Sequence, residues 1–307
     1  MIDTRRLRTL RAVADHGTVT AAAAALHLTP SAVSQQLGAL EHEVGHRLFT
    51  RDGRGVHLTA VGKIMLGHAN EVLAQLERAR ADVAAYTAGE AGEVTVACFA
   101  TAISAVLSPA ISALRASAPG IQVRVLDAEG DHGLAMLLDA EADLAVAVEY
   151  RGAPDAADRR LSRLPLYAEP FDLVLPRDHP LAGSATLGSL SGERWIGPYP
   201  GNPVHDVITF ACQQAGFTPD FAHCSDDFRA VVALVGAGAG VALVPRLALR
   251  DMAPAGVVVR RTPGAAERRV FAAVRRGADS HPVVRPLLTA LRAVASSLGG
   301  ESTPETP

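Results

Sequence analysis

Residues 18–44 constrain the fold more than any other stretch, because they predict two short helices joined by a tight corner. Thr18 can cap the first helix, and the five alanines at positions 21–25 let a second helix cross it closely. His27-Leu28 forms the corner. This pattern is typical of a helix-turn-helix, whose second helix enters the major groove of DNA. A helical hairpin in an ordinary core is the alternative.

The second helix of the pair has one apolar and one polar face. Thr29 is a favourable N-cap, and Pro30 occupies the first helical position, where its missing N–H costs no hydrogen bond. The apolar face follows spacings of 4, 3 and 4 residues through Val33, Leu37, Leu40 and Val44. Side chains suited to base edges and phosphates line the other face, namely Ser31, Ser34, Gln35 and Gln36.

Two further elements complete a predicted N-terminal domain. A helix over 4–16 would brace the pair, and Gly17 is placed to end it. Asp52-Gly53 then predicts a hairpin turn, with Arg51 and Arg54 beside its tip. Next to a helix-turn-helix, a basic hairpin indicates a wing that meets phosphates or a narrow minor groove. An ordinary solvated turn is the alternative.

A long helix follows, capped by Thr59 and reaching about Thr87. Its apolar residues alternate at spacings of 4 and 3 through Met65, Ala69, Val72, Leu76, Ala79, Val83 and Tyr86. This seam predicts a coiled coil with the same helix of a second copy, which suits DNA because two-fold proteins read paired half-sites. Packing against the chain's own body is the alternative.

The charge distribution supports this division. The chain carries a net charge of −3, but residues 1–63 hold eight Lys and Arg against five Asp and Glu, or +3, which leaves −6 for the remainder. A basic end on an acidic body suits contact with nucleic acid. No run of 18 apolar residues predicts a membrane span. The first residues lack the apolar segment of a signal peptide, so we expect a cytoplasmic protein.

Beyond a small polar hinge at 88–93, strands and helices alternate, which predicts α/β structure with a largely parallel sheet. We expect strands at 94–99, 121–126, 144–148, 161–175 (in two segments), 195–196, 221–224, 241–244, 257–259 and 270–274. Helices are expected at 101–116 with a break at Pro109, and at 131–139, 203–215, 226–235 and 281–298. Residues 299–307 read as a flexible tail.

Two consecutive α/β units of similar size suggest a hinged pair with a cleft between them. Ligands of open α/β sheets lie beyond the carboxyl ends of strands and near helix N-termini. That rule selects residues 99–101, 127–131, 197–202 and 225–227. Thr101 and Asn202 stand at predicted helix starts, where they either contact a ligand or only cap their helices.

The sequence offers little for catalysis or metal binding. The glycines at 236–240 follow a helix and precede a strand, which is the wrong order for a phosphate loop, and there is no G-x-S-x-G elbow. The histidines are scattered, and Cys98, Cys212 and Cys224 form no C-x-x-C pair. We therefore expect no catalytic residue, metal or cofactor, and cysteines that are buried and reduced rather than redox-active.

Taken together, these features resemble the LysR-type transcriptional regulators over nearly the whole chain. The most specific part combines the helix-turn-helix with Leu40-Glu41, Gly45-x-x-Leu48-Phe49-x-Arg51 and Leu58-Thr59-x-x-Gly62. A second segment is similar to one near the end of the family's second subdomain, Leu234-Val235-x-Ala237-Gly238-x-Gly240-Val241-Ala242-Leu243-Val244-Pro245.

The resemblance implies an all-α winged helix-turn-helix with a linker helix, followed by an α/β effector domain of two lobes similar to periplasmic binding proteins. The expected domains are residues 3–60 for DNA binding, 61–88 for dimerisation and 93–298 for the effector. Lobe I would span about 93–162 and 268–298, and lobe II about 163–267. Family members usually form tetramers, as dimers of dimers, and respond to a small co-inducer held between the lobes.

By position, the resemblance implies DNA contacts at Thr29, Pro30, Ser31, Ser34, Gln35 and Gln36, with Arg51 and Arg54 in the wing. Many members carry arginine at the position of Gln35, whose amide pairs with adenine rather than making the bidentate guanine contact. Effector contacts would fall on Phe99, Ala100, Thr101, Glu129, Gly130, Asn202 and Asp226.

The mouth of the predicted cleft is acidic, with carboxylates at Glu129, Asp131, Asp226 and Asp227. One hypothesis is an effector that carries an amine or a guanidine, and the alternative is that these carboxylates cap helices. Two rival protein classes were weighed. A transport receptor conflicts with the DNA-binding head and the missing signal peptide, whereas an architectural DNA binder that ignores ligands stays open.

Overall fold

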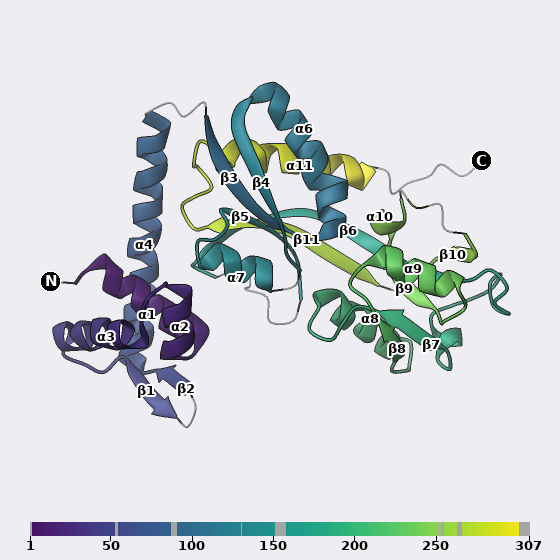
Figure 1. Ribbon diagram of the computed structural model, residues 1–307, viewed down its shortest axis with the longest axis horizontal. Coiled ribbons are helices and arrows are strands. Elements are labelled where there is room, and N and C mark those ends of the chain that lie inside the picture. Colours follow the sequence, from purple (N-terminus) through teal and green to yellow (C-terminus); the bar gives the residue numbers. More distant parts are fainter. Residues whose placement is uncertain are drawn as a thin grey trace.

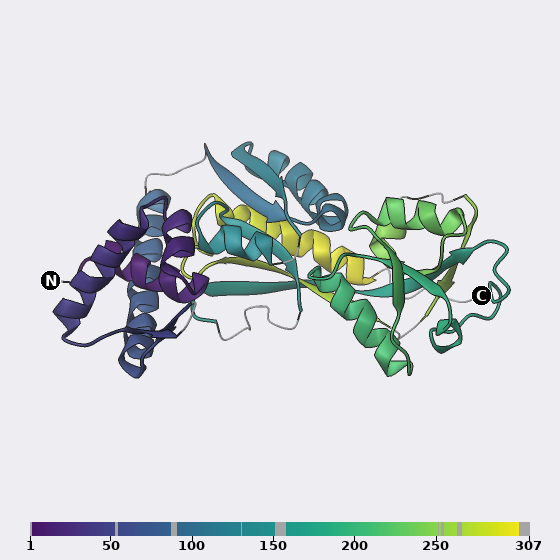
Figure 2. The same ribbon diagram turned by 60° about the horizontal axis from the view of Figure 1, so that its bottom comes forward.

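The computed structural model describes residues 2–52, 55–86, 91–129, 131–150, 158–250, 252, 255–262 and 266–300. A small head, one long helix and a two-lobed α/β region follow one another along the chain (Figure 1). The second view shows the two lobes extending away from the head in one line (Figure 2).

The head is the predicted winged helix-turn-helix. Its elements are α1 (Thr4–His16), α2 (Val19–Ala25), α3 (Pro30–Val44), β1 (Phe49–Asp52) and β2 (Gly55–Leu58). The expected caps form, because the Thr18 hydroxyl accepts from the Ala21 N–H and the Thr29 hydroxyl from the Ala32 N–H. His27 takes the left-handed conformation at the corner, with φ of 53°. Leu10, Val33 and Leu40 are fully buried in the core that the three helices share.

The long helix α4 (Ala60–Tyr86) begins at the predicted cap, where the Thr59 hydroxyl accepts from the Gly62 N–H. The predicted seam divides into two parts. Met65 and Ala69 pack into the head's own core. Further along, Val72 and Val83 are 42% and 64% exposed, whereas Ala74 and Ala81 on the opposite face are buried. The outer part of the seam therefore remains available to a partner, and the inner part does not.

Lobe I is a sheet with helices on both faces. It contains β3 (Ala91–Cys98), β4 (Gly120–Asp127), β5 (Leu144–Val148), α7 (His132–Leu138) and α11 (Val284–Gly300). β3 pairs in parallel with β4 and β5. Strand β3 begins at Ala91, so residues 91–93 of the predicted hinge belong to the strand, and residues 88–90 lie outside the described residues. Helix α11 is also shifted from the expected 281–298 and reaches Gly300; residues 301–307 of the expected tail lie outside the described residues.

The helical stretch 100–117 changes its winding before Pro109. It comprises α5 (Ala100–Ala102), the π-helical turn η1 (Ile103–Leu107) and α6 (Ser108–Ser117). A wider turn ahead of a proline accommodates the missing N–H, which gives the predicted break a physical form. Over 18 residues the stretch has a mean hydropathy of 1.2 and the length of a membrane span, which the sequence analysis overlooked. Here it packs into the core of lobe I, beside α11.

Lobe II surrounds the fully buried Trp195. It contains η2 (Gly188–Leu190), β7 (Arg194–Gly197), α8 (Pro203–Gln214), β8 (Asp220–Cys224), α9 (Phe228–Gly236), β9 (Ala242–Pro245), α10 (Arg246–Leu249) and β10 (Val257–Arg261). β7 and β8 are parallel. The short α10 was absent from the sequence prediction, because four residues carry too little periodicity to identify a helix.

Strand β6 (Leu161–Pro176) connects the two lobes as one continuous strand, where two extended segments were expected. It pairs with β11 (Glu267–Arg275) as far as Pro170, and with β9 and β10 from Phe171 onward. The change between lobes therefore falls at 170/171, later than the position near 162 expected from sequence. All pairings of β6 are antiparallel. The expectation of a largely parallel sheet was wrong. The seven-stranded sheet is mixed, because β6 and β11 pair antiparallel while β3 pairs in parallel with β4 and β5.

Candidate functional site

The first candidate surface is the polar face of α3. Among the predicted DNA contacts, Thr29, Pro30, Ser31, Ser34 and Gln35 are all exposed. Their backbone belongs to the N-terminal half of α3, where helix N–H groups and the helix dipole favour a phosphate. This face combines hydroxyls, amides and a positive helix end on a rigid element, which suits a nucleic acid groove.

Gln36 has a different environment from its neighbours. Its side chain is half-buried, and its Oε1 accepts a 2.5 Å hydrogen bond from the hydroxyl of Thr9 in α1. Thr9 is itself buried. Gln36 therefore helps to fix the angle between α1 and α3. Its side-chain oxygen is bonded to Thr9, whereas the other polar side chains of this face are exposed and can contact DNA.

The wing is joined to the head by hydrogen bonds. Glu41 of α3 accepts from the Leu48 and Phe49 N–H groups at 2.7 and 3.3 Å, and the Val56 N–H donates to the Gly17 carbonyl at 3.0 Å. β1 and β2 pair with Asp52 opposite Gly55, which matches the predicted hairpin. The side chain of Arg51 and the whole of Arg54 lie outside the described residues.

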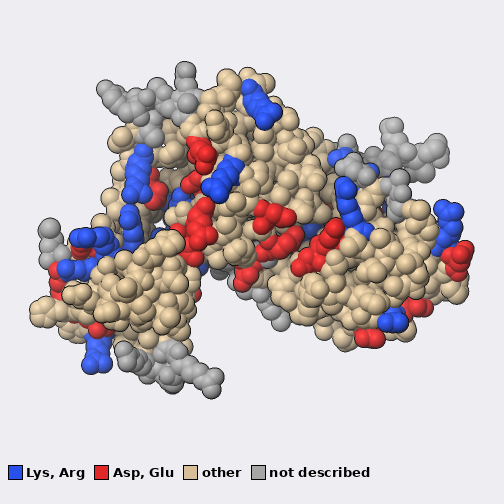
Figure 3. Space-filling view, in the orientation of Figure 1, with Lys and Arg blue, Asp and Glu red and all other residues tan. Residues whose placement is uncertain are grey.

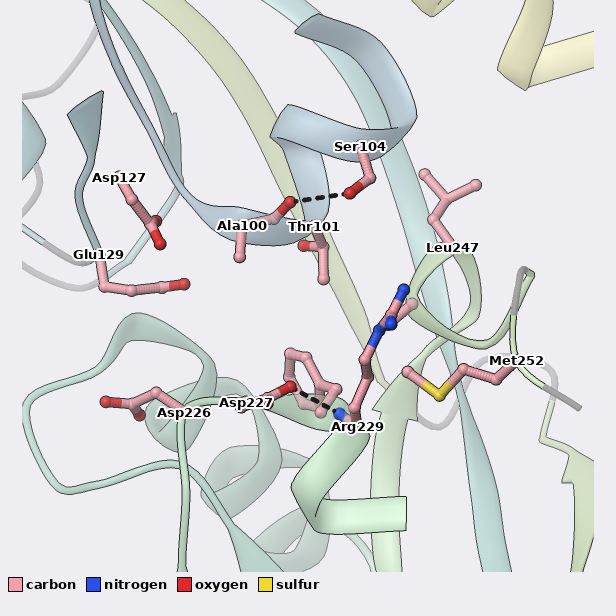
Figure 4. Close-up of a pocket in the computed structure, with 12 residues that line it drawn as sticks. Ala100, Thr101, Ser104, Asp127, Glu129, Asp226, Asp227, Arg229, Leu247 and Met252 are labelled. Carbon is pink, nitrogen blue, oxygen red and sulfur yellow. Dashed lines mark hydrogen bonds between the residues drawn. The ribbon is translucent and has the colours of Figure 1, made fainter. Parts of the chain in front are cut away.

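The second candidate site is a pocket of about 460 Å³ between the lobes. Lobe I supplies the start of α5 and the residues that follow β4, while lobe II supplies the start of α9 and the segment around α10. Glu129 reaches in from one side and Arg229 from the other (Figure 4). Acidic side chains gather on the face of the molecule where the lobes meet (Figure 3).

The predicted effector contacts are brought together only in part. Ala100, Thr101, Glu129 and Asp226 line the pocket. Phe99 is 3% exposed and lies beneath it in the core of lobe I. Asn202 stands behind the pocket and is also buried. Its Nδ2 donates to Asp226 of lobe II at 3.0 Å and to Glu129 of lobe I at 3.4 Å, and its Oδ1 caps α8. Gly130 lies outside the described residues.

The two aspartates at the start of α9 act within the protein. Asp227 caps the helix by accepting from the Arg229 N–H at 2.8 Å. Asp226 accepts from the Tyr199 N–H as well as from Asn202, and its carboxylate points away from the pocket centre (Figure 4). Asp227 therefore caps a helix, as the alternative expected, whereas Asp226 is held by hydrogen bonds within lobe II and caps no helix. On the lobe I side, Glu129 extends into the pocket, and Asp127 lines it as well (Figure 4).

Glu129 is unusual in its ionisation. Burial raises its pKa to about 7, and the nearby Asp226 and Asp127 carboxylates add to this effect, while Arg268 and the Asn202 hydrogen bond oppose it. The carboxyl group is thus poised between its neutral and ionised forms at neutral pH. A cation placed next to it would favour the ionised form, whereas a carboxylate ligand would favour the neutral one.

A buried ion pair lies beneath the pocket. Arg268 of β11 and Glu169 of β6 are 2% and 3% exposed, and their side chains meet at 2.6 Å. Arg268 also donates to the Thr101 hydroxyl at 2.7 Å, and Glu169 accepts from the Leu247 N–H at 3.0 Å. The pair therefore links α5 of lobe I, both crossing strands and α10 of lobe II.

Sequence analysis did not identify several residues of the pocket. Arg229, Leu247, Ala248 and Met252 belong to it but carry no motif. Arg268 and Glu169 are buried charges on β11 and β6, but other charged residues such as Arg269 and Asp172 stand beside them in the same strands. A charged side chain at a buried strand position implies a partner, but Arg268 lay outside the strand expected at 270–274, so alternation did not identify the pair.

One metal-binding pattern escaped the sequence analysis. Residues 42–46, His-Glu-Val-Gly-His, match the H-E-x-x-H signature of zinc enzymes, which needs both histidines on one helix. Here α3 ends at Val44, and Gly45 adopts φ of 76° as its C-cap. His46 therefore lies beyond the helix. Within the described ranges, no group of three His, Cys, Asp or Glu side chains is arranged to hold a metal ion.

The buried cysteines are expected to react slowly with alkylating reagents. Burial raises the pKa of the Cys98 and Cys212 thiols, that of Cys212 to about 12, so the reactive thiolate is scarce. Native Cys98 and Cys212 are expected to react with iodoacetamide roughly 1,000-fold more slowly than a free cysteine at pH 8. Peptide mapping by mass spectrometry, before and after denaturation, measures this. Equal labelling of both thiols in the native and the denatured protein would refute burial as the controlling factor.

Comparison with known proteins gives consistent matches over most of the chain. A sequence model of bacterial regulatory helix-turn-helix proteins of the lysR family matches residues 4–63, and one of the LysR substrate binding domain matches residues 87–296. YnfL, an uncharacterized HTH-type transcriptional regulator of Escherichia coli K12, is 30% identical over 261 residues, covering 82% of this chain and 86% of YnfL. MetR, an HTH-type transcriptional regulator of Salmonella typhimurium, is 30% identical over 296 residues, covering 95% of this chain and 90% of MetR.

A solved structure gives the same picture. A cysteine mutant of OxyR from Corynebacterium glutamicum, with hydrogen peroxide bound, superposes with a TM-score of 0.59 at 25% identity. The superposition covers 97% of this chain and 96% of the OxyR chain. Both the head and the two-lobed region therefore have counterparts in one experimentally determined protein.

Proposed function

The chain belongs to the LysR family of bacterial transcriptional regulators, and from this we propose that it reads a two-fold symmetric operator with α3 and responds to a small effector in the interlobe pocket. The observation that supports the reading of an operator is the exposed polar face of α3, on a head whose net charge is positive. We infer that the protein acts in the cytoplasm, where the chromosome lies, and that it has no enzymatic role.

For DNA, we propose contacts by Thr29, Pro30, Ser31, Ser34 and Gln35, with Arg51 and Arg54 on the flanking backbone. Exposed hydroxyls and helix N–H groups suit phosphates, while the amide of Gln35 suits an adenine edge. Gln36 contributes through the orientation of α3, because its oxygen is bonded to Thr9. Selection from a pool of random duplexes tests this proposal. It is expected to return a dyad-symmetric consensus, and an unenriched pool would refute sequence-specific reading.

We propose that α4 forms the dimer. Its outer seam presents Val72 and Val83 to solvent on the face opposite Ala74 and Ala81, and two such helices in a coiled coil would bury them. The heads would then stand on either side of a two-fold axis, as paired half-sites require. The oligomer of the family, a dimer of dimers, extends this arrangement to four heads.

The interlobe pocket supports a switching mechanism. It is lined by both lobes, so a bound molecule contacts residues that move relative to one another when the lobes rotate. Such a ligand shifts the arrangement of linker helices only as far as it binds one arrangement better, typically by about 1–3 kcal/mol of coupling. The change in lobe arrangement would reach the DNA-binding heads through lobe I, which contacts α1 and α4 by ion pairs.

The effector is proposed to carry an amine or guanidine next to Glu129. A cation competes with the proton on this carboxyl group, whose pKa is about 7. Affinity is therefore expected to rise roughly 30-fold from pH 5.5 to 8.5, with most of the rise below pH 7. The measurement is calorimetric titration of hits from a panel of amino acids, diamines and carboxylic acids.

Glu129→Gln should flatten this pH profile, and Glu267→Gln on the exposed face of β11 should leave it unchanged. Hits that are carboxylates without an amine, with affinity falling as the pH rises, would contradict the cationic effector while leaving the DNA-binding proposal intact.

A further inference from the structure

A pocket lined by arginines lies where the head, the linker helix and lobe I meet, far from the interlobe pocket in the fold. Its walls come from α1, α4, the start of β6 and the end of β11. Figures 1 and 2 both place the head and α4 beside lobe I. One lining side chain is acidic, Glu77, which pairs with Arg80 of its own helix at 3.3 Å, and six are cationic, namely Arg8, Arg11, Arg159, Arg160, Arg275 and Arg276.

Several contacts hold this junction together. Arg160 of lobe I bridges Asp158 of its own segment and Asp15 of α1. His16 of α1 lies 3.0 Å from Asp139 of lobe I. Arg159 meets Glu71 of α4 at 2.9 Å. Close packing accompanies these pairs, because a Cβ on Gly277 would lie 2.6 Å from the Ala74 carbonyl oxygen of α4. The head is thus docked on lobe I by specific contacts.

Three of the arginines form no direct ion pair with a carboxylate at the junction, although Asp15 lies close enough to Arg11 to attract its charge. Among the residues that the structure describes, the side chains of Arg8, Arg11 and Arg276 make no hydrogen bond or ion pair. The acid nearest along α1, Asp15, is held by Arg160. Burial lowers the pKa of the half-buried Arg11; the Asp15 carboxylate opposes this shift, and the surrounding arginines add to it. Enclosing a charge without a counter-ion costs free energy, so this arrangement favours a bound anion.

Asn70 of α4 adds an uncharged group to the same pocket. The Oδ1 of Asn70 is buried and has no hydrogen-bond partner within the described residues. A side-chain amide that turns about its last bond presents Nδ2 donors in place of the oxygen. The junction therefore combines guanidinium forks, which match oxyanions in a bidentate way, with an unsatisfied amide.

We propose that this junction binds a compact inorganic oxyanion of the phosphate or sulfate type, which fastens the DNA-binding head to lobe I. The pocket is small, about 30 Å³, and excludes a nucleotide. Two of its walls are the exposed side chains of Arg159 and Arg276, which can swing outward to admit the anion. The anion supplies the negative charge that Arg8, Arg11 and Arg276 lack.

Inorganic phosphate titrated into the full-length protein, at constant ionic strength set with sodium chloride, tests the proposal. The midpoint temperature of thermal unfolding is expected to rise with phosphate and then level off. The rise should be about 5 °C at phosphate concentrations near 100 times Kd. Arg11→Gln and Arg276→Gln should abolish this rise. Arg11→Gln should also unfold at the same temperature as the wild type or higher without phosphate, because it removes a repelled charge.

Arg285→Gln, which removes an exposed arginine from α11, serves as the matched control and should retain the full response. A phosphate response of wild-type size in both junction variants would overturn the proposal, since it would reflect general salt effects. Loss of stability in phosphate-free Arg11→Gln would also contradict it, because the guanidinium would then have a partner within the protein.

Discussion

Replacing Gln35 by Glu is expected to lower operator affinity at least 100-fold. Gln35 is exposed on the polar face of α3, where a carboxylate would face the phosphates and lose the donor of the amide. Each good base contact is worth about 1–3 kcal/mol, and repulsion from the DNA backbone adds to its loss. Fluorescence anisotropy with the selected operator, at one fixed salt concentration, measures the change.

Gln75→Glu provides the control for net charge. Gln75 is an exposed glutamine on α4, and its Oε1 accepts from Arg78 at 2.7 Å, a contact that glutamate preserves. Its operator affinity should stay within about twofold of the wild type. If both variants weaken binding equally, the effect is one of overall charge, and α3 is not the reading element.

Replacing Glu169 by Gln is expected to destabilise the effector domain by about 3–5 kcal/mol, because it leaves the Arg268 guanidinium buried without its counter-ion. The pair is almost inaccessible to solvent and joins both lobes. Such a loss corresponds to a fall in Tm of roughly 10 °C for a domain of this size. Urea and thermal unfolding followed by circular dichroism give both quantities.

A double variant distinguishes the effect of an unpaired buried charge from disruption of the surrounding packing. Glu169→Gln with Arg268→Met removes both charges and should recover much of the lost stability. Glu267→Gln removes a carboxylate from the exposed pair with Arg269 and should cost less than about 1 kcal/mol. A double variant less stable than either single variant would show that the surrounding packing, rather than the charge, sets the stability.

The head was predictable from sequence because its determinants are local. Thr18 and Thr29 cap the helices that follow them, Pro30 begins α3 and Gly45 ends it, each within a few residues of the feature it controls. The apolar spacing of Val33, Leu37 and Leu40 likewise defines a buried face without reference to the rest of the chain.

The two-lobed region was predicted less completely because its arrangement depends on distant contacts. Periodicity located most strands, but nothing local shows that β6 runs through both lobes or that β11 returns antiparallel beside it. The pocket shows the same limit. The positions selected beyond strand ends include Thr101 and Glu129, which line the pocket, and Phe99, which is buried beneath it. Arg229 and Met252 also line the pocket, from segments that carry no motif.

The central claim is that α3 reads sequence, and the most direct measurement compares a selected operator with a scrambled duplex across 50–300 mM salt. We expect at least about 1,000-fold tighter binding to the operator near physiological salt, with both affinities falling steeply as salt rises. Equal affinity for the two duplexes at every salt concentration would contradict it and would leave only an electrostatic, architectural DNA binder.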